Sequence, residues 1–282
     1  MGTKLSVIII SFNTRWILRR CLAMLDGTIR DGACEVIVVD NNSTDGSLEM
    51  MAAEFPEITV IRNEKNVGFA KANNQAIKIA RGEYLLLLNS DAFATSDAIG
   101  SLVRFLDCHS SACIAGPKVL NSDGSLQSKG FFFPSVFYSI FTLVKMHRIV
   151  PHKFLSRILR HYYWSENETR EVDWVSGCCL LVRKDAISQI GPLSEDFFMY
   201  CEDVELCFRA KKHGYQVWYV PEAVVTHLNC GSKCENRQEL LQASRKILYG
   251  KSLGLNAGRL VKLNSVVALQ IAHMKRKLPF VN

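Results

Sequence analysis

The chain has 282 residues, of which 48% are hydrophobic and 22% are charged, and this composition excludes disordered and fibrous proteins. Its ten cysteines do not form the closely spaced framework of a small secreted domain. Residues 1–4 run directly into an apolar strand pattern, with no signal peptide visible. We therefore expect a globular protein in a reduced, cytoplasmic compartment.

The formal net charge of +7 comes from the C-terminal part of the chain. No acidic residue follows Glu239, whereas residues 245–282 contain eight Lys or Arg. Residues 124–165 also lack acidic side chains and combine six Lys or Arg with many aromatic residues. Both segments suit contact with an anionic membrane surface, and the alternative is a solvated basic face. Neither segment is expected to span a bilayer, and no nucleic-acid-binding motif accompanies the charge.

The first hundred residues alternate apolar strand patterns with helical patterns. The expected strands are residues 5–10, 35–39, 58–61 and 84–88. The expected helices are residues 16–25, 47–55, 69–80 and 96–106. Apolar strands that alternate with helices predict a parallel sheet covered on both faces. In such α/β folds, which often bind nucleotides, ligands lie beyond the carboxyl ends of the strands.

The second half of the chain has a less regular pattern. Its expected elements are a turn at 121–124, a strand at 174–182, a helix at 203–213 and a strand at 216–220 closed by Pro221. The pattern from residue 238 onward is helical. We expect three regions, namely a nucleotide-binding half at 1–110, a second half at 111–237, and a basic helical extension at 238–282.

Two acidic residues follow predicted strands closely. Asp40 comes directly after one strand, and Asp91 follows another strand by two residues. Because parallel strands end at the same edge of a sheet, we expect both carboxylates to lie in one crevice. Proteins commonly hold Mg²⁺ beside phosphates through one or two such carboxylates. The alternative is helix capping, by Thr44 or Asp45 in the run that follows Asp40 and by Asp91 itself before the next helix.

A third acidic group stands at the start of the helix predicted from residue 203. Glu202, Asp203 and Glu205 follow an aromatic run, where they could interact with the helix dipole or supply a general base. His227 could complete a metal site, although a lone histidine is more often structural. A zinc site that adds Cys230 and Cys234 to His227 lacks an evident fourth ligand. Calcium-loop, phosphate-loop and dinucleotide-binding fingerprints are absent.

Together these patterns resemble the family 2 glycosyltransferases, and especially the rhamnosyltransferase-like branch that builds bacterial surface polysaccharides. The resemblance covers residues 5–228 in order. Its motifs lie at residues 6–13, 38–47, 66–74, 86–91, 174–177, 198–209 and 227. It implies a GT-A type α/β fold, in which a mostly parallel central sheet is flanked by helices.

The resemblance also implies roles for individual residues. The nucleotide-binding positions would be Ser11, Asn13, Asp40, Asn42, Asn66, Gly68, Asn73, Asn89 and Ser90. Asp91 and His227 would hold a divalent cation, Mg²⁺ or Mn²⁺, since Asn89 stands where the family often has a second acid. Asp203 would be the catalytic base, with Glu202 and Glu205 as orienting or acceptor-binding groups. Trp174 and Gly177 would lie beside the acceptor and the donor sugar.

The implied reaction is a single inverting displacement on a nucleotide diphosphate sugar, with dTDP-rhamnose as the expected donor. The acceptor would be a hydroxyl of a glycan or a lipid-linked molecule, met by a peripheral enzyme at the inner face of the plasma membrane. One alternative is another donor, such as UDP-galactofuranose, UDP-glucose or UDP-GlcNAc. A second alternative is a non-catalytic subunit that binds a sugar nucleotide, although such a subunit would need no base.

Overall fold

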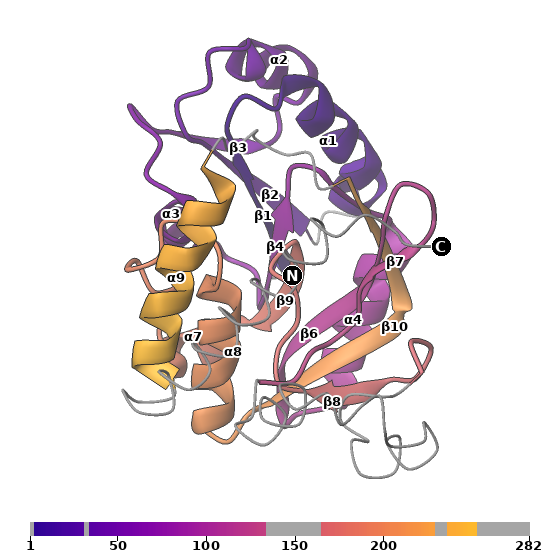
Figure 1. Ribbon diagram of the computed structural model, residues 1–282. Coiled ribbons are helices and arrows are strands. Elements are labelled where there is room, and N and C mark those ends of the chain that lie inside the picture. The colour runs from indigo at the N-terminus through magenta and orange to yellow at the C-terminus, as the bar shows by residue number, and fades with distance from the viewer. Residues whose placement is uncertain (1–2, 31–33, 134–164, 229–235, 253–282) are drawn as a thin grey trace, which may run out of the picture. The chain divides into compact units, whose positions relative to one another are not determined.

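The computed structural model describes residues 3–30, 34–133, 165–228 and 236–252 (Figure 1). The chain divides into two units, one of residues 1–131 with 166–244 and one of residues 132–165 with 245–282. The first unit contains every strand of the described residues. Most of the second unit lies outside the described residues. In the described part, no helix is long and apolar enough to cross a membrane.

The N-terminal part of the first unit alternates strands and helices as predicted. Its elements are β1 Leu5–Ser11, α1 Arg15–Arg30, β2 Cys34–Asp40, α2 Ser47–Glu54, β3 Thr59–Arg62, α3 Phe69–Ile79 and β4 Tyr84–Asn89. The four strands lie in the order β3-β2-β1-β4, and each neighbouring pair is parallel. The predicted boundaries of these elements differ from the observed ones by at most one residue, except at the C-terminal end of α1, which lies five residues further on.

The second part of the unit adds strands whose pairings are mostly antiparallel. Its elements are β5 Ala92–Ala94, α4 Ser96–Cys108, β6 Ala112–Leu120, β7 Leu126–Ser128, β8 Arg170–Val172, β9 Cys179–Arg183, α7 Lys184–Ile190, α8 Glu202–Lys212, β10 Gln216–His227 and α9 Arg237–Ser252. They extend the sheet to the order β3-β2-β1-β4-β9-β6-β10-β5. The three longest ladders, β1 with β2, β1 with β4 and β6 with β10, are parallel. The sheet is therefore mostly parallel, as predicted.

Two predicted strands have different limits in the structure. The strand expected to end at Pro221 continues to His227, because a bulge between Val220 and Val224 takes the proline out of the β6–β10 ladder. The strand expected from Trp174 begins only at Cys179. Trp174 forms an isolated bridge with Phe131 instead. Residues 175–178 are consequently a loop, and its last residue is hydrogen-bonded to the end of β4.

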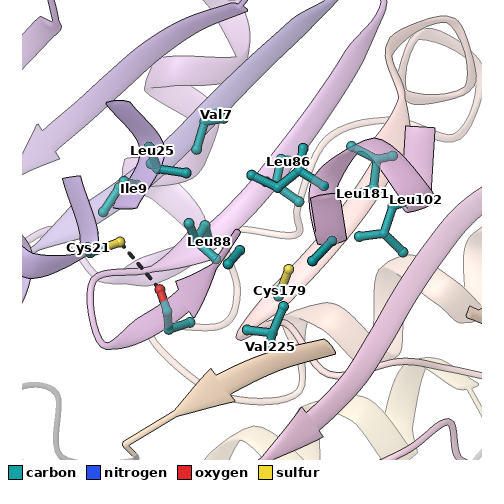
Figure 2. Packing of buried hydrophobic residues seen from close by; sticks show 14 of the residues in the cluster. Val7, Ile9, Cys21, Leu25, Leu86, Leu88, Leu102, Cys179, Leu181 and Val225 are labelled. Atoms are coloured by element: carbon teal, nitrogen blue, oxygen red, sulfur yellow. Dashed lines mark hydrogen bonds between the residues drawn. The ribbon is translucent and has the colours of Figure 1, made fainter. Parts of the chain in front are cut away.

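The hydrophobic core explains why the strand patterns are apolar throughout. Alternate residues of β1, β4 and β9, such as Val7, Leu86 and Leu181, pack with α1 and α4 into one cluster (Figure 2). The residues between them, such as Ile8 and Leu87, are equally buried on the other face of the sheet. A strand buried on both faces has no polar positions to alternate with its apolar ones.

The buried cysteines belong to this core. The thiol of Cys21 donates a hydrogen bond to the backbone carbonyl of Ala92 at 3.3 Å, and burial raises its pKa to about 12 (Figure 2). Burial likewise raises the pKa of Cys179 and Cys207. A thiol with such a pKa is not a nucleophile at neutral pH. These cysteines are therefore packing groups.

Candidate active site

The carboxyl ends of three neighbouring strands bring the predicted donor residues together. In the ladders of β1 with β2 and β4, Ser11 pairs with Asp40 and Ile10 pairs with Asn89. Asp40 and the segment that begins at Asn89 therefore lie on the two sides of β1, at one edge of the sheet (Figure 1). This is the arrangement predicted for Asp40 and Asp91.

Asp40 is completely buried, and its two carboxylate oxygens differ. Oδ1 accepts a hydrogen bond from the backbone N–H of Ser43 at 2.9 Å. Oδ2 has no hydrogen-bond partner among the described residues. An unsatisfied buried polar group costs about 1–3 kcal/mol, and such groups are usually explained by a ligand, a water or a function. The free oxygen marks a position where the N–H of a ligand could bind.

Capping of the nearby helices does not depend on Asp40. Asp45 performs that role, because its carboxylate accepts from the backbone N–H of Arg15 at 2.7 Å and of Ser47 at 3.1 Å. These two residues begin α1 and α2. Of the two capping residues expected in this run, Thr44 and Asp45, the structure shows these contacts for Asp45.

Asparagines shape the loops around Asp40. Asn13 and Asn42 have positive φ angles of 53° and 71°, a conformation that asparagine tolerates better than most residues. The side chain of Asn13 accepts from the backbone N–H of Thr44 at 2.8 Å, which ties the loop after β1 to the loop after β2. The hydroxyl of Ser11 is buried and lies 3.1 Å from that of Thr14.

The predicted residues of α3 lie where this helix meets the loop before α8. Asn66 accepts from the backbone N–H of Gly68 at 2.9 Å, and Asn73 donates to the carbonyl of Phe69 at 2.9 Å. The side-chain oxygen of Asn73 is buried without a partner among the described residues. Gly68 has a φ of +88°, and a Cβ there would stand 2.6 Å from the carbonyl oxygen of Phe198.

Asp91 is buried and does not cap the next helix. The cap of α4 is Thr95, whose hydroxyl accepts from the N–H of Ala98 at 3.2 Å. Oδ1 of Asp91 instead lies 3.1 Å from Nε2 of His227. The short strand β5, which the sequence did not predict, explains this contact because its antiparallel pairing with β10 sets Ala92 opposite His227.

The hydrogen bonds of His227 indicate which ring nitrogen faces Asp91 with a lone pair. Nδ1 lies 2.6 Å from Oε1 of Gln127, an oxygen that only accepts, so Nδ1 carries the proton. When the ring carries this proton alone, Nε2 presents its electron pair toward the carboxylate of Asp91. Two acceptors at 3.1 Å repel each other unless a proton or a metal ion lies with them.

These contacts fit a hard divalent cation at Asp91 and His227. Among the described residues, no group of three or more His, Cys, Asp or Glu side chains gathers around one point. Mg²⁺ sites beside substrate phosphates need only one or two protein ligands, however, with phosphate and water completing the shell. The side chain of Asn89, whose Nδ2 lies 3.4 Å from Nε2 of His227, is a donor and not a further ligand in this arrangement.

Asp203, at the start of α8, is connected by backbone hydrogen bonds to the carboxyl edge of the sheet. Oδ2 of Asp203 accepts from the N–H of Gly177 at 2.7 Å, and Oδ1 accepts from the N–H of Val204 at 2.8 Å. The next residue in the loop, Cys178, accepts from the N–H of Asn89 at 2.9 Å through its carbonyl. The loop at 176–178 therefore connects Asp203 to the end of β4.

The thiol of Cys178 is buried and is affected by the charges of two acids. Burial raises the pKa of this thiol to about 12, and the negative charges of Asp203 and Asp91 contribute to the rise. Cys178 is therefore not a nucleophile at neutral pH.

Glu202 and Asp203 form a tightly coupled pair of carboxyl groups. Burial raises the pKa of Glu202, and the charge of Asp203 adds to this effect. Burial also raises the pKa of Asp203, while the hydrogen bonds from Gly177 and Val204 oppose it. Oε2 of Glu202 has no hydrogen-bond partner among the described residues. This pair is suited to holding a proton at an active site.

Glu205 lies on the same helix, but its carboxylate is paired with an arginine. Its two oxygens accept from Nε of Arg209 at 2.8 and 2.9 Å. The guanidinium of Arg209 also donates to the carbonyls of Ile190, Gly191 and Pro192 at the end of α7. These contacts favour an orienting role for Glu205, because its carboxylate holds α8 against α7.

Trp174 stacks on Phe131 with ring centroids 4.2 Å apart and the planes 19° from parallel. This places an aromatic pair on the chain just before Gly177. The position of Trp174 beside an acceptor stays a prediction, as do the ligand-binding roles of the other predicted residues.

Sequence reasoning missed Gln127, which contacts His227, and two residues that support nearby segments, Thr95 and Cys178. Gln127 lies in a three-residue strand of a polar segment, where no motif or spacing distinguishes it. Thr95 could have been found, because a threonine just before a helical pattern is a capping signal. Only the fold shows that the carbonyl of Cys178 accepts from the N–H of Asn89.

Comparison with known proteins identifies the family to which this chain belongs. The model of glycosyl transferase family 2 matches residues 6–191, well over half of the chain. The chain belongs to this family and is a glycosyltransferase. The matched range ends before α8, so Glu202 and Asp203 lie outside it.

Two curated relatives cover most of the chain. The chain is 29% identical over 264 residues to N-acetylglucosaminyl-diphospho-decaprenol L-rhamnosyltransferase of Mycobacterium tuberculosis, which covers 88% of this chain and 84% of the relative. It is 25% identical over 223 residues to a low-salt glycan biosynthesis hexosyltransferase of Haloferax volcanii, which covers 77% of this chain and 64% of the relative. Both relatives are glycosyltransferases by name.

Solved structures show that the fold is of the GT-A type. A structure of GalNAc-T7 with UDP, GalNAc and Mn²⁺ has a TM-score of 0.60 at 16% identity, over 80% of this chain and 44% of that one. The mannosyltransferase PcManGT from Pyrobaculum calidifontis, with GDP-Man and Mn²⁺, has a TM-score of 0.57 at 16% identity, over 88% and 62%. This chain thus spans less than two thirds of either protein. The likeness concerns the fold alone.

Proposed function

We propose that this glycosyltransferase moves rhamnose from dTDP-rhamnose to a hydroxyl of a glycan or lipid-linked acceptor, with inversion at the anomeric carbon. The relative from Mycobacterium tuberculosis is named for transfer of L-rhamnose to N-acetylglucosaminyl-diphospho-decaprenol, which supports both the sugar and a lipid-linked acceptor. The observation that carries the proposal is the backbone link from Asp203 through Gly177 and Cys178 to Asn89. It joins the proposed base to the edge of the sheet where a diphosphate would lie.

The nucleotide would bind at the ends of β1 and β2. The unpaired Oδ2 of Asp40 would accept the N–H of the pyrimidine base, which satisfies an oxygen that is otherwise buried without a partner among the described residues. The loop residues Ser11, Asn13 and Asn42 would surround the base and the ribose. Asn66, Gly68 and Asn73 would contact the donor from the start of α3, and Ser90 from the end of β4.

The diphosphate would lie beside Asp91 and His227, which would together hold Mg²⁺ or Mn²⁺. Such a cation, when bound, would neutralise the negative charge that develops on the departing diphosphate. The two compared structures that contain Mn²⁺ support this part of the proposal for the fold. The facing electron pairs of Asp91 and His227 support it for this chain.

The chemical step would use Asp203 as the base. The acceptor oxygen attacks the anomeric carbon on the face opposite the diphosphate, and its proton passes to a carboxylate oxygen of Asp203. The bond between the anomeric carbon and the diphosphate oxygen breaks, and its electron pair leaves with the nucleoside diphosphate. A base with a raised pKa is well matched to this proton transfer near neutral pH. Trp174 and Gly177 would border the two sugars.

The acceptor side would be completed at an anionic membrane surface in bacterial envelope polysaccharide synthesis. The basic segments 124–165 and 245–282 would make this contact, and most of both segments lies outside the described residues. A peripheral position would bring the site to a lipid-linked acceptor. Deletion of residues 253–282 should weaken binding to vesicles that contain anionic lipid and leave nucleotide binding unchanged.

A donor screen tests the proposal. Purified protein is mixed with dTDP-rhamnose, UDP-galactofuranose, UDP-glucose or UDP-GlcNAc, with N-acetylglucosaminyl-diphospho-lipid as acceptor and with Mg²⁺, Mn²⁺ or a chelator. We expect cation-dependent release of dTDP and a rhamnosylated product. Turnover with a UDP-sugar instead would replace the donor in the proposal. Thermal stabilisation by a donor without product from any acceptor would favour the non-catalytic binding subunit.

A further inference from the structure

Asp91 and His227, the two residues proposed to bind a cation, lie next to a series of hydrogen-bonded side chains. This series begins in the turn between β6 and β7. Asp123 accepts from the hydroxyl of Ser125 at 2.6 Å. That hydroxyl oxygen accepts from Nδ2 of Asn121 at 2.9 Å. Oδ1 of Asn121 accepts from Nε2 of Gln127 at 2.7 Å. Four polar side chains of one hairpin therefore form a continuous series that ends at His227.

The direction of every hydrogen bond in this chain follows from its carboxylate end. The ionised carboxylate of Asp123 has no proton to give, so the single proton of the Ser125 hydroxyl points to it. The Ser125 oxygen can then only accept from Asn121, which turns the amide oxygen of Asn121 toward Gln127. Gln127 must therefore present its NH₂ group to Asn121.

The backbone provides an independent check on the orientation of Gln127. Its Nε2 also donates to the carbonyl oxygen of His227 at 3.0 Å, and a carbonyl oxygen can only accept. Both acceptors lie on the NH₂ side of the amide. Oε1 therefore faces Nδ1 of the His227 ring, at 2.6 Å. The side chain of Gln127 is thus hydrogen-bonded to both the backbone and the ring of His227.

We infer that Gln127 is a positioning residue that selects the Nδ1–H tautomer of His227 and aims Nε2 at the cation held with Asp91. Gln127 does not contact the cation itself and acts only through His227. The inference about affinity rests on the proposed function, since it requires a cation at this pair. The inference about the tautomer concerns the protein alone.

The physical reason is that a ring nitrogen can bind a metal only through a free electron pair. An acceptor on Nδ1–H holds the proton away from Nε2 and fixes the angle of the ring. Loss of such a supporting group typically weakens metal binding by ~10–100-fold. The contribution of Gln127 should be of this size, although its sequence context carries no motif.

Three variants separate the positioning role from simple loss of structure. Gln127→Leu keeps the approximate size of the side chain and removes both the acceptor and the donors. Gln127→Glu keeps an acceptor for Nδ1–H and removes the donors. Gln216→Leu makes the same change as the first variant at the opposite end of β10, where Gln216 accepts from Ser111 and Trp218.

The tautomer is measured by ¹⁵N NMR of the histidine rings without any metal, with the His227 signals identified by their loss in His227→Gln. We expect the Nδ1–H form in the unaltered protein, in Gln127→Glu and in Gln216→Leu. In Gln127→Leu the Nε2–H form should gain population. An Nε2–H ring in the unaltered protein would overturn the inference, and so would an unchanged tautomer in Gln127→Leu.

Cation affinity is measured by electron paramagnetic resonance of Mn²⁺ titrated into protein with dTDP or UDP. Gln127→Leu should bind Mn²⁺ ~10–100-fold more weakly, whereas Gln127→Glu and Gln216→Leu should stay within a few-fold of the unaltered protein. Equal affinity in Gln127→Leu would overturn the inference. If the unaltered protein bound no Mn²⁺, the cation part of the proposed function would fail instead, and the NMR result would still decide the role of Gln127.

Discussion

The carboxyl edge of the sheet and the start of α8 both contribute acidic residues to the candidate site, but the segments that lead to them are built in different ways. Asp40 ends a regular strand, and Asp91 follows another by two residues, so ladder hydrogen bonds set their positions. The loop at residues 197–201 has no such ladder. Tyr200 and Cys201 have left-handed φ angles of 72° and 70°, which are unfavourable for residues with a Cβ.

Contacts from distant parts of the chain hold this loop. The carbonyl of Phe198 accepts from the N–H of Phe69 at 2.7 Å, and the carbonyl of Met199 accepts from the hydroxyl of Ser244 at 2.7 Å. Asp203 is then held by Gly177. Asp40 and Asp91 are therefore positioned by the strands that they follow. The loop at 197–201, and Asp203 after it, depend instead on contacts with α3, α9 and the loop at 176–178. Changes at the two regions should therefore affect different steps.

The largest effect on kcat should come from a change of Asp203, at the start of α8. Asp203→Asn should lower kcat by ~10²–10⁴-fold, because the amide cannot take up the acceptor proton. Donor binding should be nearly unchanged, since the amide oxygen can still accept from the N–H of Gly177. Single-turnover kinetics and thermal stabilisation by dTDP measure the two effects. Near-normal kcat would show that the base is another residue.

A change at the carboxyl edge of the sheet should weaken donor binding as well as lower the rate of transfer. Asp91→Ala should weaken Mn²⁺-dependent binding of the donor by ~10²-fold, the upper end of what loss of a group that supports a metal costs. Calorimetry of dTDP binding with and without Mn²⁺ measures the change. Thr95→Ala, which removes only the cap of α4, is the control and should leave this binding intact. Unaltered Mn²⁺ dependence in Asp91→Ala would separate this acid from the cation.

A smaller effect should come from the link between the two regions. A Cβ at Gly177 would stand 3.0 Å from Cβ of Asp203, so Gly177→Ala should displace the base by a few tenths of an ångström. We expect kcat to fall ~10-fold, less than the 10²-fold that a displacement of about 1 Å can cost. Gly250→Ala in α9, where no atom of the described residues outside the helix's own backbone lies within 4 Å of the added Cβ, should leave kcat unchanged. Equal rates in both variants would show that the link tolerates movement.

The smallest effect concerns stability and its dependence on pH. The pKa of Glu202 is raised in the folded protein from its ordinary value of 4.5. Below that pH the group is protonated in both states. Above it the unfolded chain releases the proton while the folded protein keeps it, so the free energy of unfolding falls as pH rises. Glu202→Gln should therefore match the unaltered protein near pH 4.5 and become the more stable of the two at neutral pH.

Urea unfolding at the two pH values measures this difference. Glu205→Gln is the matched control on the same helix, because its carboxylate is paired with Arg209. Loss of that pairing should destabilise the protein at neutral pH, which is the opposite sign. A destabilised Glu202→Gln at neutral pH would show that ionised Glu202 has a partner that stabilises it.

The sequence predicted the donor edge better than the catalytic loop, and the reason is the range of the interactions. The apolar runs before Asp40 and Asp91 define buried parallel strands, and the ends of such strands meet. The limits of the strand at Trp174 and of the strand at Pro221 were wrong, because both depend on pairing partners far along the chain. The bulge beside Pro221 and the bridge to Phe131 have no local signal.

By itself, the sequence determined the fold class, the family and the positions of Asp40, Asp91 and Asp203, because apolar periodicity and ordered motifs are properties of neighbouring residues. Only the tertiary structure decided that β5 brings His227 to Asp91 and that Asp45 and Thr95 are the caps. It also decided that Glu205 is held by Arg209 and that Gln127 holds His227. Each of these contacts joins side chains whose partners are set by strand pairing and helix packing, and their residue types alone do not specify them.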